Sequence, residues 1–338
     1  MHGNIALFIP HLGCPHACSF CDQRSISGEE KPVTPEEVTK ILTAAFEKQP
    51  DPETTEIAFF GGSFTCLPKE DMEGLLKAAH PFIKARRCSG IRVSTRPDGI
   101  SEGILETLSR YGVTAIELGA QSLSDEVLLK NYRGHTAADV FEATAAIRAY
   151  GGFSLGLQVM AGLYGDSHGT FQSTMEGVMR IRPDTVRIYP TVVLEGTELA
   201  RLTREGLYTP LSVEEAVEWV APWLPRLEEA GIRVIRVGLH PSETMERRLV
   251  GGAYHSAFRE LCEGRLYWMK LEEKLRRFSV GTRLAGAVAP KELSKAIGQK
   301  KENLLKAKAL GYPLRIRGKE GILPGEVEIS VENPYNLK

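Results

Sequence analysis

The first 240 residues alternate short apolar runs with longer amphipathic segments, and no other feature constrains the fold as strongly. The short runs are rich in apolar and β-branched residues, as strands buried on both faces are. Alternation of strands and helices predicts a parallel sheet covered by helices. The expected strands span residues 5–9, 56–60, 91–95, 115–118, 155–159, 185–189 and 233–236. The expected helices span residues 35–48, 69–85, 102–110, 137–150, 170–180 and 213–230.

Six or seven such units favour a closed or partly closed barrel over a doubly wound sheet, the alternative architecture. Both architectures bring their working groups to the carboxyl ends of the strands. Unusual residues do follow the strands here, because three cysteines follow the first strand and Gly61 and Gly62 follow the second. We therefore predict an α/β chain, with a partial parallel barrel of the (β/α)6 type over residues 1–239 and a small α+β module over residues 240–338.

The composition excludes several classes of protein. Apolar residues make up 42% of the chain and charged residues 25%, which argues against a disordered or collagen-like chain. No apolar run approaches the roughly 20 residues that a membrane-spanning helix needs. The apolar run at residues 5–10 lacks a basic flank and is too short for a signal-peptide core. By elimination we expect a cytoplasmic protein without a membrane partner.

Three of the six cysteines, Cys14, Cys18 and Cys21, lie within eight positions of the loop that follows the first strand. In a reducing compartment, such crowding indicates a metal or redox site. The C-x3-C-x2-C spacing can hold three irons of a [4Fe-4S] cluster. Since such a cluster normally takes four cysteines, the fourth iron is left open to a ligand. The alternative is a zinc site completed by His11 or His16, but structural zinc usually shows paired C-x2-C units, and no second pair follows.

The cysteine spacing resembles the signature of the radical S-adenosylmethionine (SAM) superfamily. The resemblance implies a [4Fe-4S] cluster on Cys14, Cys18 and Cys21, with S-adenosyl-L-methionine chelating the open iron and Phe20 packed near its adenine. It also implies reductive cleavage of SAM to a 5′-deoxyadenosyl radical. The electron would come from an external low-potential donor, such as flavodoxin or ferredoxin.

Residues after the second and third strands are further candidates for SAM contacts. Two glycines after a strand let the backbone approach a ligand closely. In this context Gly61, Gly62 and Ser63 resemble the family motif that hydrogen-bonds the SAM amino group. Ser94 stands where several family members contact the SAM ribose.

The remaining candidates lie at the end of the fourth or fifth strand or follow the fourth strand. A guanidinium grips a carboxylate through two parallel hydrogen bonds, so Arg133 is expected at the SAM carboxylate. Gln121 and Gln158 are expected at the ribose or the adenine. For each of the three, a buried polar residue that satisfies backbone groups is the alternative. The sequence does not identify a catalytic residue.

Four stretches narrow the resemblance to the radical SAM domain of the Elongator catalytic subunit. They are residues 94–98 (STRPD), 119–122 (GAQS), 133–136 (RGHT) and 187–199 (RIYPTVVLEGTEL). The similarity covers roughly residues 5–240. It implies modification of the wobble uridine of transfer RNA (tRNA), which in that family uses an acetyl group from acetyl-CoA.

The chain also departs from that family. Its first two cysteines are much closer together, and Ser94, Gln158 and Arg187 stand where the family has Glu, His and Lys. The 98 residues after His240 lack the glycine-rich pyrophosphate turn of an acetyltransferase domain, so the acetyl-CoA reaction is not expected to carry over. The short cysteine spacing is shared with the oxygen-independent coproporphyrinogen oxidase group.

Residues 270–338 are basic, with 15 Lys and Arg against 8 Asp and Glu, whereas the rest of the chain carries 27 against 35. A basic region on an acidic body hints at a polyanionic partner, and a solvated lysine-rich surface is the alternative. We expect a basic helix over residues 291–310 and strands over 314–317 and 327–329. The candidate RNA contacts are Lys295, Lys300, Lys301, Lys306, Arg315 and Arg317.

The sequence therefore favours a radical SAM enzyme that modifies a tRNA base. One alternative is a radical SAM enzyme acting on a small molecule or a porphyrin-like substrate. The other is a non-catalytic, metal-bound scaffold.

Overall fold

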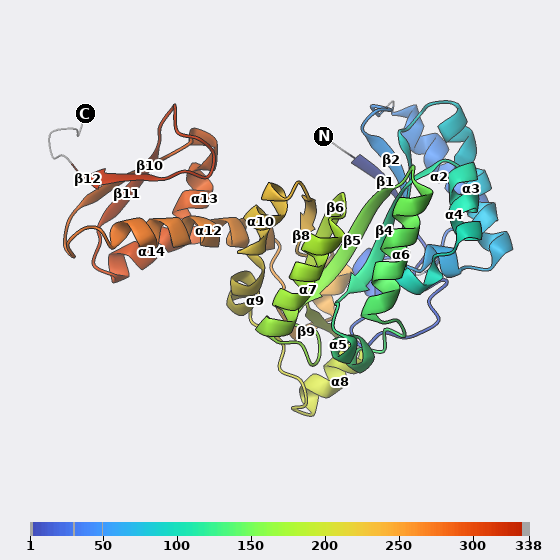
Figure 1. The fold of residues 1–338 in the computed structure, drawn as a ribbon, viewed down its shortest axis with the longest axis horizontal. Coiled ribbons are helices and arrows are strands. Elements are labelled where there is room, and N and C mark those ends of the chain that lie inside the picture. The colour runs from blue at the N-terminus through green and yellow to red at the C-terminus, as the bar shows by residue number, and fades with distance from the viewer. Residues whose placement is uncertain (1–2, 30, 49, 333–338) are drawn as a thin grey trace. The chain divides into compact units, whose positions relative to one another are not determined.

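The computed structural model describes residues 3–29, 31–48 and 50–332. The chain divides into two compact units, shown in Figure 1. The first comprises residues 1–212 and 225–256, and the second comprises residues 213–224 and 257–338. The assignment of separate roles to residues 1–239 and 240–338 stays a prediction.

The first unit is built on a seven-stranded sheet in the order β1-β2-β3-β4-β5-β6-β8, and every neighbouring pair is parallel. Because successive strands are neighbours joined by helical crossovers, the sheet curls in one sense into a half-barrel. The predicted α/β class and all seven predicted strands are confirmed. The strands are β1 (Gly3–Phe8), β2 (Thr55–Phe60), β3 (Gly90–Thr95), β4 (Val113–Gln121), β5 (Ser154–Ala161), β6 (Thr185–Pro190) and β8 (Arg233–Val237).

Five longer helices connect these strands, and they match the predicted segments. Figure 1 shows α6 lying along β4 and β5. Thr34 begins α2 with a capping box, since its hydroxyl accepts from the Glu37 amide and the Glu37 carboxylate accepts from the Thr34 amide. The helices are α2 (Pro35–Glu47), α3 (Lys69–Lys84), α4 (Glu102–Arg110), α6 (Ala137–Tyr150) and α7 (His168–Ile181).

The prediction of one helix over residues 213–230 was wrong. Two helices occupy that segment, α9 (Val213–Val220) and α10 (Trp223–Glu229). Pro222 lies between them. Proline lacks an amide hydrogen and disfavours helical geometry at the residue before it, so the chain breaks there.

The first unit also contains short elements that the sequence did not predict. Each spans only three to seven residues, too few to show a hydrophobic period. β7 and β9 pair antiparallel as a two-stranded ribbon. The elements are α1 (Gln23–Ser27), α5 (Asp125–Lys130), β7 (Val192–Leu194), α8 (Glu198–Arg204), α11 (Glu243–Arg247), β9 (Leu249–Gly252) and the 3-10 turns Phe64–Cys66 and Pro97–Gly99.

The two faces of the curled sheet differ in chemistry. On β4, Ile116 and Leu118 are fully buried. Successive side chains of a strand point to opposite faces. Glu117 lies between those two residues and is also buried, but it forms an ion pair with Arg187 of β6. One face therefore packs apolar residues, while the other brings charged groups together.

The second unit is a small α+β module, as predicted. Its three-stranded sheet has the order β11-β10-β12, with β11 parallel and β12 antiparallel to β10. The central strand β10 was not predicted. Trp268 and Leu271 pack with the sheet residue Leu314 in its core. The elements are α12 (Phe258–Leu275), β10 (Leu284–Val288), α13 (Leu293–Ile297), α14 (Glu302–Ala309), β11 (Leu314–Gly318), β12 (Glu328–Val331) and the 3-10 turns Pro290–Glu292 and Gln299–Lys301.

The prediction of one continuous helix over residues 291–310 was wrong. The segment is divided between α13 and α14, and the break lies at Gly298, whose φ is +78°. Lys300 and Lys301 also adopt positive φ, at +50° and +64°. Right-handed helices require negative φ, so these three residues end one helix before the next begins. In the part of the chain that is described, no helix is long and apolar enough to cross a membrane.

Candidate active site

The cysteine loop packs directly on the glycine turn that follows β2. The His11 amide donates to the Gly61 carbonyl (2.9 Å), and the Ser63 amide donates to the Leu12 carbonyl (3.0 Å). A Cβ atom added to Gly62 would lie 2.3 Å from the Leu12 carbonyl oxygen, so no side chain fits at this position. A Cβ on Gly13, whose φ is +73°, would meet the Ser63 carbonyl oxygen at the same distance. Glycine on both sides therefore allows the two backbones to touch.

Each of the three loop thiols has a polar side chain as a neighbour. Metal-bound thiolates are commonly held and tuned by such hydrogen-bonding partners around the ligands. The three contacts join Cys14 Sγ to Ser63 Oγ (3.6 Å), Cys18 Sγ to Arg133 Nη1 (3.0 Å) and Cys21 Sγ to Gln23 Nε2 (3.6 Å).

The three thiols also act on one another. Burial and the neighbouring Cys18 and Cys14 together raise the pKa of Cys21 to about 12. Without a bound cation, the Cys21 thiol therefore keeps its proton at neutral pH, and a metal that binds must displace that proton. Within residues 3–29, 31–48 and 50–332, no three His, Cys, Asp or Glu side chains are gathered around one point as ligands of a single metal ion. A [4Fe-4S] cluster accommodates thiols that lie farther apart than the ligands of a single ion, because each thiol binds a different iron.

Arg133 is held beside these thiols by the turn between α5 and α6. One terminal nitrogen donates to Cys18, and the other donates to the Gly119 carbonyl of β4 (2.7 Å). The Nε of Arg133 is buried and has no partner among the described residues. The next residue, Gly134, has φ +69°, and a Cβ there would lie 2.3 Å from the His16 ring. Two of the donors of Arg133 are thus already engaged, and its role at the SAM carboxylate stays a prediction.

The two predicted glutamines meet at the carboxyl ends of neighbouring strands. Gln158 Nε2 on β5 donates to Gln121 Oε1 on β4 (3.2 Å). Gln121 has φ +66°, an uncommon conformation for a residue other than glycine, and it is buried. Ser94 lies on β3 and donates its hydroxyl to Glu117 (3.4 Å). Their contacts with SAM are predictions that the structure does not test.

Phe20 projects from the cysteine loop into two apolar clusters. One cluster contains Leu163 of the segment after β5, and the other contains Leu199 of α8. The ring of Phe20 is partly buried there. It is thus held between the end of the sheet and α8, and its place near the adenine stays a prediction.

Two residues near the site were not identified from the sequence. Asn131 is fully buried and bonds to Ser19 of the cysteine loop (2.6 Å). His135 is buried, its Nε2 lies 3.3 Å from the Ala120 carbonyl, and its Nδ1 has no partner among the described residues. Burial, together with the nearby Arg133, lowers the pKa of His135 to about 4, so the ring is neutral at pH 7. His135 lies within the quoted RGHT stretch and Asn131 lies two residues before it, and only this position signalled their importance.

Comparison with protein families supports the expectations from the sequence. The model of the radical SAM superfamily matches residues 8–178. A second model, described as the radical SAM C-terminal domain, matches residues 183–267. The cysteine loop and the strands β2 to β5 lie within the first match.

Similar proteins include a tRNA uridine(34) acetyltransferase of Dehalococcoides mccartyi. It is 27% identical over 242 residues, which cover 61% of this chain and 52% of that protein. Elongator complex protein 3 of Homo sapiens is 30% identical over 234 residues, which cover 62% of this chain and 41% of that protein. The predicted resemblance to the Elongator catalytic subunit family is confirmed, and the chain spans about half the length of the curated relatives it matches.

Solved structures show the same fold. Elp3 of the archaeon Methanocaldococcus infernus matches with a TM-score of 0.60 at 23% identity, over 82% of this chain and 66% of that one. SuiB of Streptococcus suis, bound to S-adenosylmethionine, matches with a TM-score of 0.51 at 14% identity, over 76% of this chain and 54% of that one. At these identities the likeness establishes a curled, partial parallel barrel.

Proposed function

Because this chain belongs to the radical SAM superfamily, we propose that it is the radical-generating part of a tRNA-modifying enzyme, with the cluster on Cys14, Cys18 and Cys21. The superfamily uses a [4Fe-4S] cluster and S-adenosyl-L-methionine, and the chain is an enzyme of that kind. The cluster, when reduced, supplies the electron that splits SAM into methionine and a 5′-deoxyadenosyl radical. An external low-potential donor, flavodoxin or ferredoxin, provides that electron.

The observation that carries this proposal is the packing of the cysteine loop on the glycine turn. It brings Ser63 within 3.6 Å of Cys14, and the turn between α5 and α6 brings Arg133 within 3.0 Å of Cys18, so donors from two other parts of the barrel face the thiols. Hydrogen bonds to the sulfurs stabilise their ionised form. The chain thus offers hydrogen-bonding side chains to the thiolates that would form when a metal displaces their protons.

The residues near the loop divide the binding of SAM among them. The amino group of SAM would be held beside Gly61, Gly62 and Ser63, whose turn packs on the cysteine loop. The unpaired Nε of Arg133 offers a donor to the carboxylate. The ribose and the adenine would be held by Phe20, Ser94, Gln121 and Gln158.

The tRNA substrate rests on the relatives and on the charge of the second unit. Of the six basic side chains predicted to contact RNA, three are engaged in ion pairs: Lys295 with Glu263 and Glu292, Lys306 with Glu302, and Arg315 with Glu332. Lys300, Lys301 and Arg317 have no ion pair with any described residue and are exposed. Unpaired cations are the ones available to phosphates.

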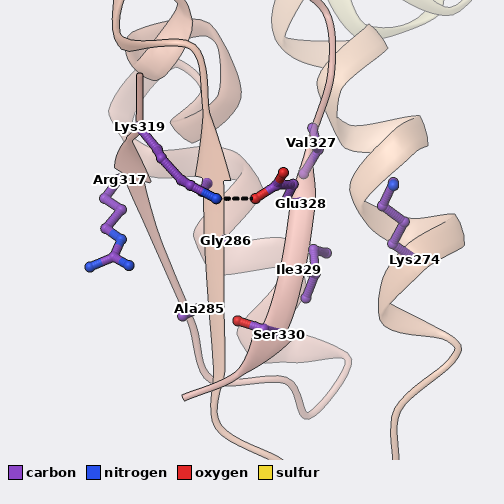
Figure 2. A pocket seen from close by; sticks show the side chains of 10 residues that line it. Lys274, Ala285, Gly286, Arg317, Lys319, Val327, Glu328, Ile329 and Ser330 are labelled. Atoms are coloured by element: carbon purple, nitrogen blue, oxygen red, sulfur yellow. Dashed lines mark hydrogen bonds and ion pairs between the residues drawn. The ribbon is translucent and has the colours of Figure 1, made fainter. Parts of the chain in front are cut away.

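A hollow of about 450 Å³ lies over the sheet of the second unit. Its floor contains the small residues Ala285 and Ala287 of β10. Two other lining residues form an ion pair, in which Lys319 Nζ donates to Glu328 Oε2 at 2.7 Å. Figure 2 shows the Arg317 side chain pointing away from that ion pair. This face offers an open surface with a free guanidinium, which suits the sugar–phosphate backbone of RNA.

Anaerobic reconstitution with iron and sulfide tests the chemistry. We expect a brown protein that releases 5′-deoxyadenosine from SAM when dithionite is added, and a Cys18→Ala variant that releases none. Cys262→Ala is the matched control, because Cys262 is buried in the second unit. Release by Cys18→Ala at the level of the unchanged protein, or a colourless protein, contradicts the assignment.

Binding of purified tRNA tests the substrate. We expect binding that weakens as salt rises, with a shallower salt dependence for Arg317→Ala. Lys77→Ala is the control, because Lys77 is an exposed cation of the first unit that pairs with Glu73. If the protein does not bind tRNA even at low salt, tRNA is excluded as the substrate. The alternative of a small molecule or a porphyrin-like substrate then remains. If tRNA does bind, mass spectrometry of tRNA nucleosides from a deletion strain would identify the modified base.

A further inference from the structure

A four-residue turn joins the two small helices that lie between β10 and β11 in the second unit. The chain runs from β10 through α13 to residues 298–301, and then through α14 to β11. β10 and β11 are parallel neighbours in the sheet, so the two helices and their turn form one crossover connection. The turn lies at the middle of this crossover, where α13 ends and α14 begins.

The turn has a backbone conformation that residues other than glycine rarely adopt. Gly298, Lys300 and Lys301 have φ angles of +78°, +50° and +64°. The Lys301 amide donates to the Gly298 carbonyl at 3.1 Å, which closes the turn. A lysine with positive φ is strained, and such a conformation persists only where the surrounding structure holds it in place. The shape of this turn is therefore imposed by its neighbours.

Asn303 of α14 holds the turn from the inside of the module. Its side chain is buried, and Nδ2 donates to the Ala296 carbonyl of α13 (3.1 Å) and to the Gly264 carbonyl of α12 (2.9 Å). A Cβ atom on Gly298 would lie 3.2 Å from Asn303 Cγ, so the turn passes this side chain with little room to spare. The end of α13 and the start of α14 are thus tied together.

The two lysines of the turn differ in their charge pairing from other basic residues of the same helices. Lys300 and Lys301 are exposed, and neither forms an ion pair within the part of the chain that the structure describes. By contrast, Lys306 of α14 pairs with Glu302, and Lys295 of α13 pairs with two glutamates. Two adjacent unpaired cations on a rigid turn are suited to consecutive phosphates of a polyanion.

Accessible apolar side chains precede and follow the turn in the chain. Ile297 is the last residue of α13 and is only partly buried, and Leu305, within the first turns of α14, is 60% exposed. Unpaired bases can pack on protein side chains, whereas the bases of a duplex are stacked on one another. A cationic turn between such apolar residues therefore suits an unpaired strand better than a duplex.

We propose that residues 298–301 grip the sugar–phosphate backbone of a single-stranded RNA segment, about four nucleotides long. RNA-binding modules of the KH class clamp a strand with a glycine-x-x-glycine turn in this way. Here Lys301 stands in place of the second glycine and keeps a positive φ, so the turn carries an additional charge. The inference rests on the proposed function, because it names the part of the tRNA that the second unit holds, an unpaired loop or end.

Binding of a labelled RNA oligonucleotide to the full chain tests the site by fluorescence anisotropy. The same oligonucleotide is measured as a single strand and after annealing to its complement, at one salt concentration. We expect the single strand to bind about tenfold more tightly than the duplex, because only the single strand offers unstacked bases beside its phosphates.

The double variant Lys300→Gly/Lys301→Gly should weaken binding of the single strand about tenfold or more. Loss of two phosphate contacts should also lower the slope of log K against log salt by about 1.4. Glycine adopts positive φ without strain, so this variant removes the two charges and keeps the shape of the turn. Circular dichroism during thermal unfolding verifies that the variant is folded.

The matched control is Arg276→Ala/Arg277→Ala. It also removes two adjacent exposed cations of the second unit, but each of these pairs with a glutamate one helical turn earlier in the chain. We expect the control to bind the single strand within about twofold of the unchanged protein, since paired cations contribute little to phosphate binding.

Equal affinity of the glycine variant and the control for the single strand overturns the inference. A duplex that binds as tightly as the single strand, or a protein that binds neither RNA, overturns it too. The measurement requires neither SAM nor an electron donor, and it uses short RNAs in place of tRNA. Its failure is therefore distinguishable from failure of the proposed function, which shows as absent 5′-deoxyadenosine release or absent tRNA binding.

Discussion

Ser19 of the cysteine loop is bonded twice to Asn131 at the end of α5. The Ser19 amide donates to the Asn131 carbonyl (3.2 Å), and the Ser19 hydroxyl donates to the Asn131 side-chain oxygen (2.6 Å). The Asn131 amide nitrogen in turn donates to the carbonyls of Val127 (2.7 Å) and Tyr164 (2.9 Å). Ser19 follows Cys18 in the chain, so Asn131 fixes the loop next to this cysteine.

Replacement of Asn131 by Ala should loosen the cysteine loop. The change removes two buried hydrogen bonds and one partly buried one, and it leaves the Ser19 hydroxyl and the Tyr164 carbonyl without these partners, so we expect a loss of about 2–4 kcal/mol in the free energy of unfolding. Ser19→Ala removes one of those bonds and should cost about 1 kcal/mol. Urea denaturation measures both, and iron per protein after reconstitution should fall more in Asn131→Ala. Equal iron content in the two variants would argue against an anchoring role.

Replacement of Gly62 by Ala should separate the cysteine loop from the glycine turn. The new Cβ would lie 2.3 Å from the Leu12 carbonyl oxygen and 2.6 Å from that of Ile9, and backbone cannot move aside as a flexible side chain can. We expect a loss of about 2–3 kcal/mol in the free energy of unfolding and a lower iron content.

Gly103→Ala is the control for this change. Gly103 lies in α4, and a Cβ there would meet nothing within 4 Å. Alanine stabilises a helix relative to glycine, so this variant should gain up to about 1 kcal/mol. A Gly62→Ala protein as stable as the control would contradict the close approach of the two backbones.

His135 should make the stability of the protein depend on pH. Its pKa falls from 6.5 to about 4 on folding, because burial and then Arg133 disfavour the charged ring. Between these values the unfolded chain binds a proton that the folded chain does not, so stability rises with pH and levels off above about 6.5. Between pH 5 and pH 7.5 this one group should add about 2 kcal/mol.

Urea denaturation at several pH values measures this contribution. In His135→Gln the group no longer titrates, so the stability of the unchanged protein should rise more steeply between pH 5 and pH 7 than that of the variant. A constant difference between the two proteins over that range would show that His135 does not titrate abnormally.

The sequence predicted the strands because each is a continuous apolar run with a turn after it. Residues 185–189, for example, were expected as a strand, and β6 spans Thr185–Pro190. Helices with a hydrophobic stripe and a start signal were equally visible, as Thr34 and α2 show. The six residues of α5 are fewer than two turns, so no periodicity distinguishes them from a loop.

The contacts within the site could not be predicted, because they join residues far apart in the chain. Glu117 and Arg187 are 70 positions apart, and Ser19 and Asn131 are 112 apart. A single sequence shows which residue types follow the strands, but it does not show which side chains meet. The cysteine spacing was informative because its members lie on one loop and their chemistry is local.

Replacement of Arg133 by Lys should weaken SAM binding while the positive charge is kept. The guanidinium reaches Cys18 and the Gly119 carbonyl with two different nitrogens at 3.0 and 2.7 Å, and its Nε remains for a third partner. A single ammonium nitrogen cannot hold this planar, forked arrangement. Loss of one charge-assisted hydrogen bond corresponds to about 10- to 100-fold weaker binding.

Equilibrium dialysis of SAM on the reconstituted protein measures this loss. Arg110→Lys is the matched control, since Arg110 is an exposed arginine of α4 that pairs only with the nearby Glu106 among the described residues. Iron content must be compared in the same preparations, because a variant that fails to assemble the cluster would also fail to bind SAM. Normal iron content with weakened SAM binding would assign Arg133 to the cofactor. Normal iron content with unchanged SAM binding would contradict a contact between Arg133 and SAM. The role of Arg133 would then be limited to its hydrogen bonds with Cys18 and with the Gly119 carbonyl of β4.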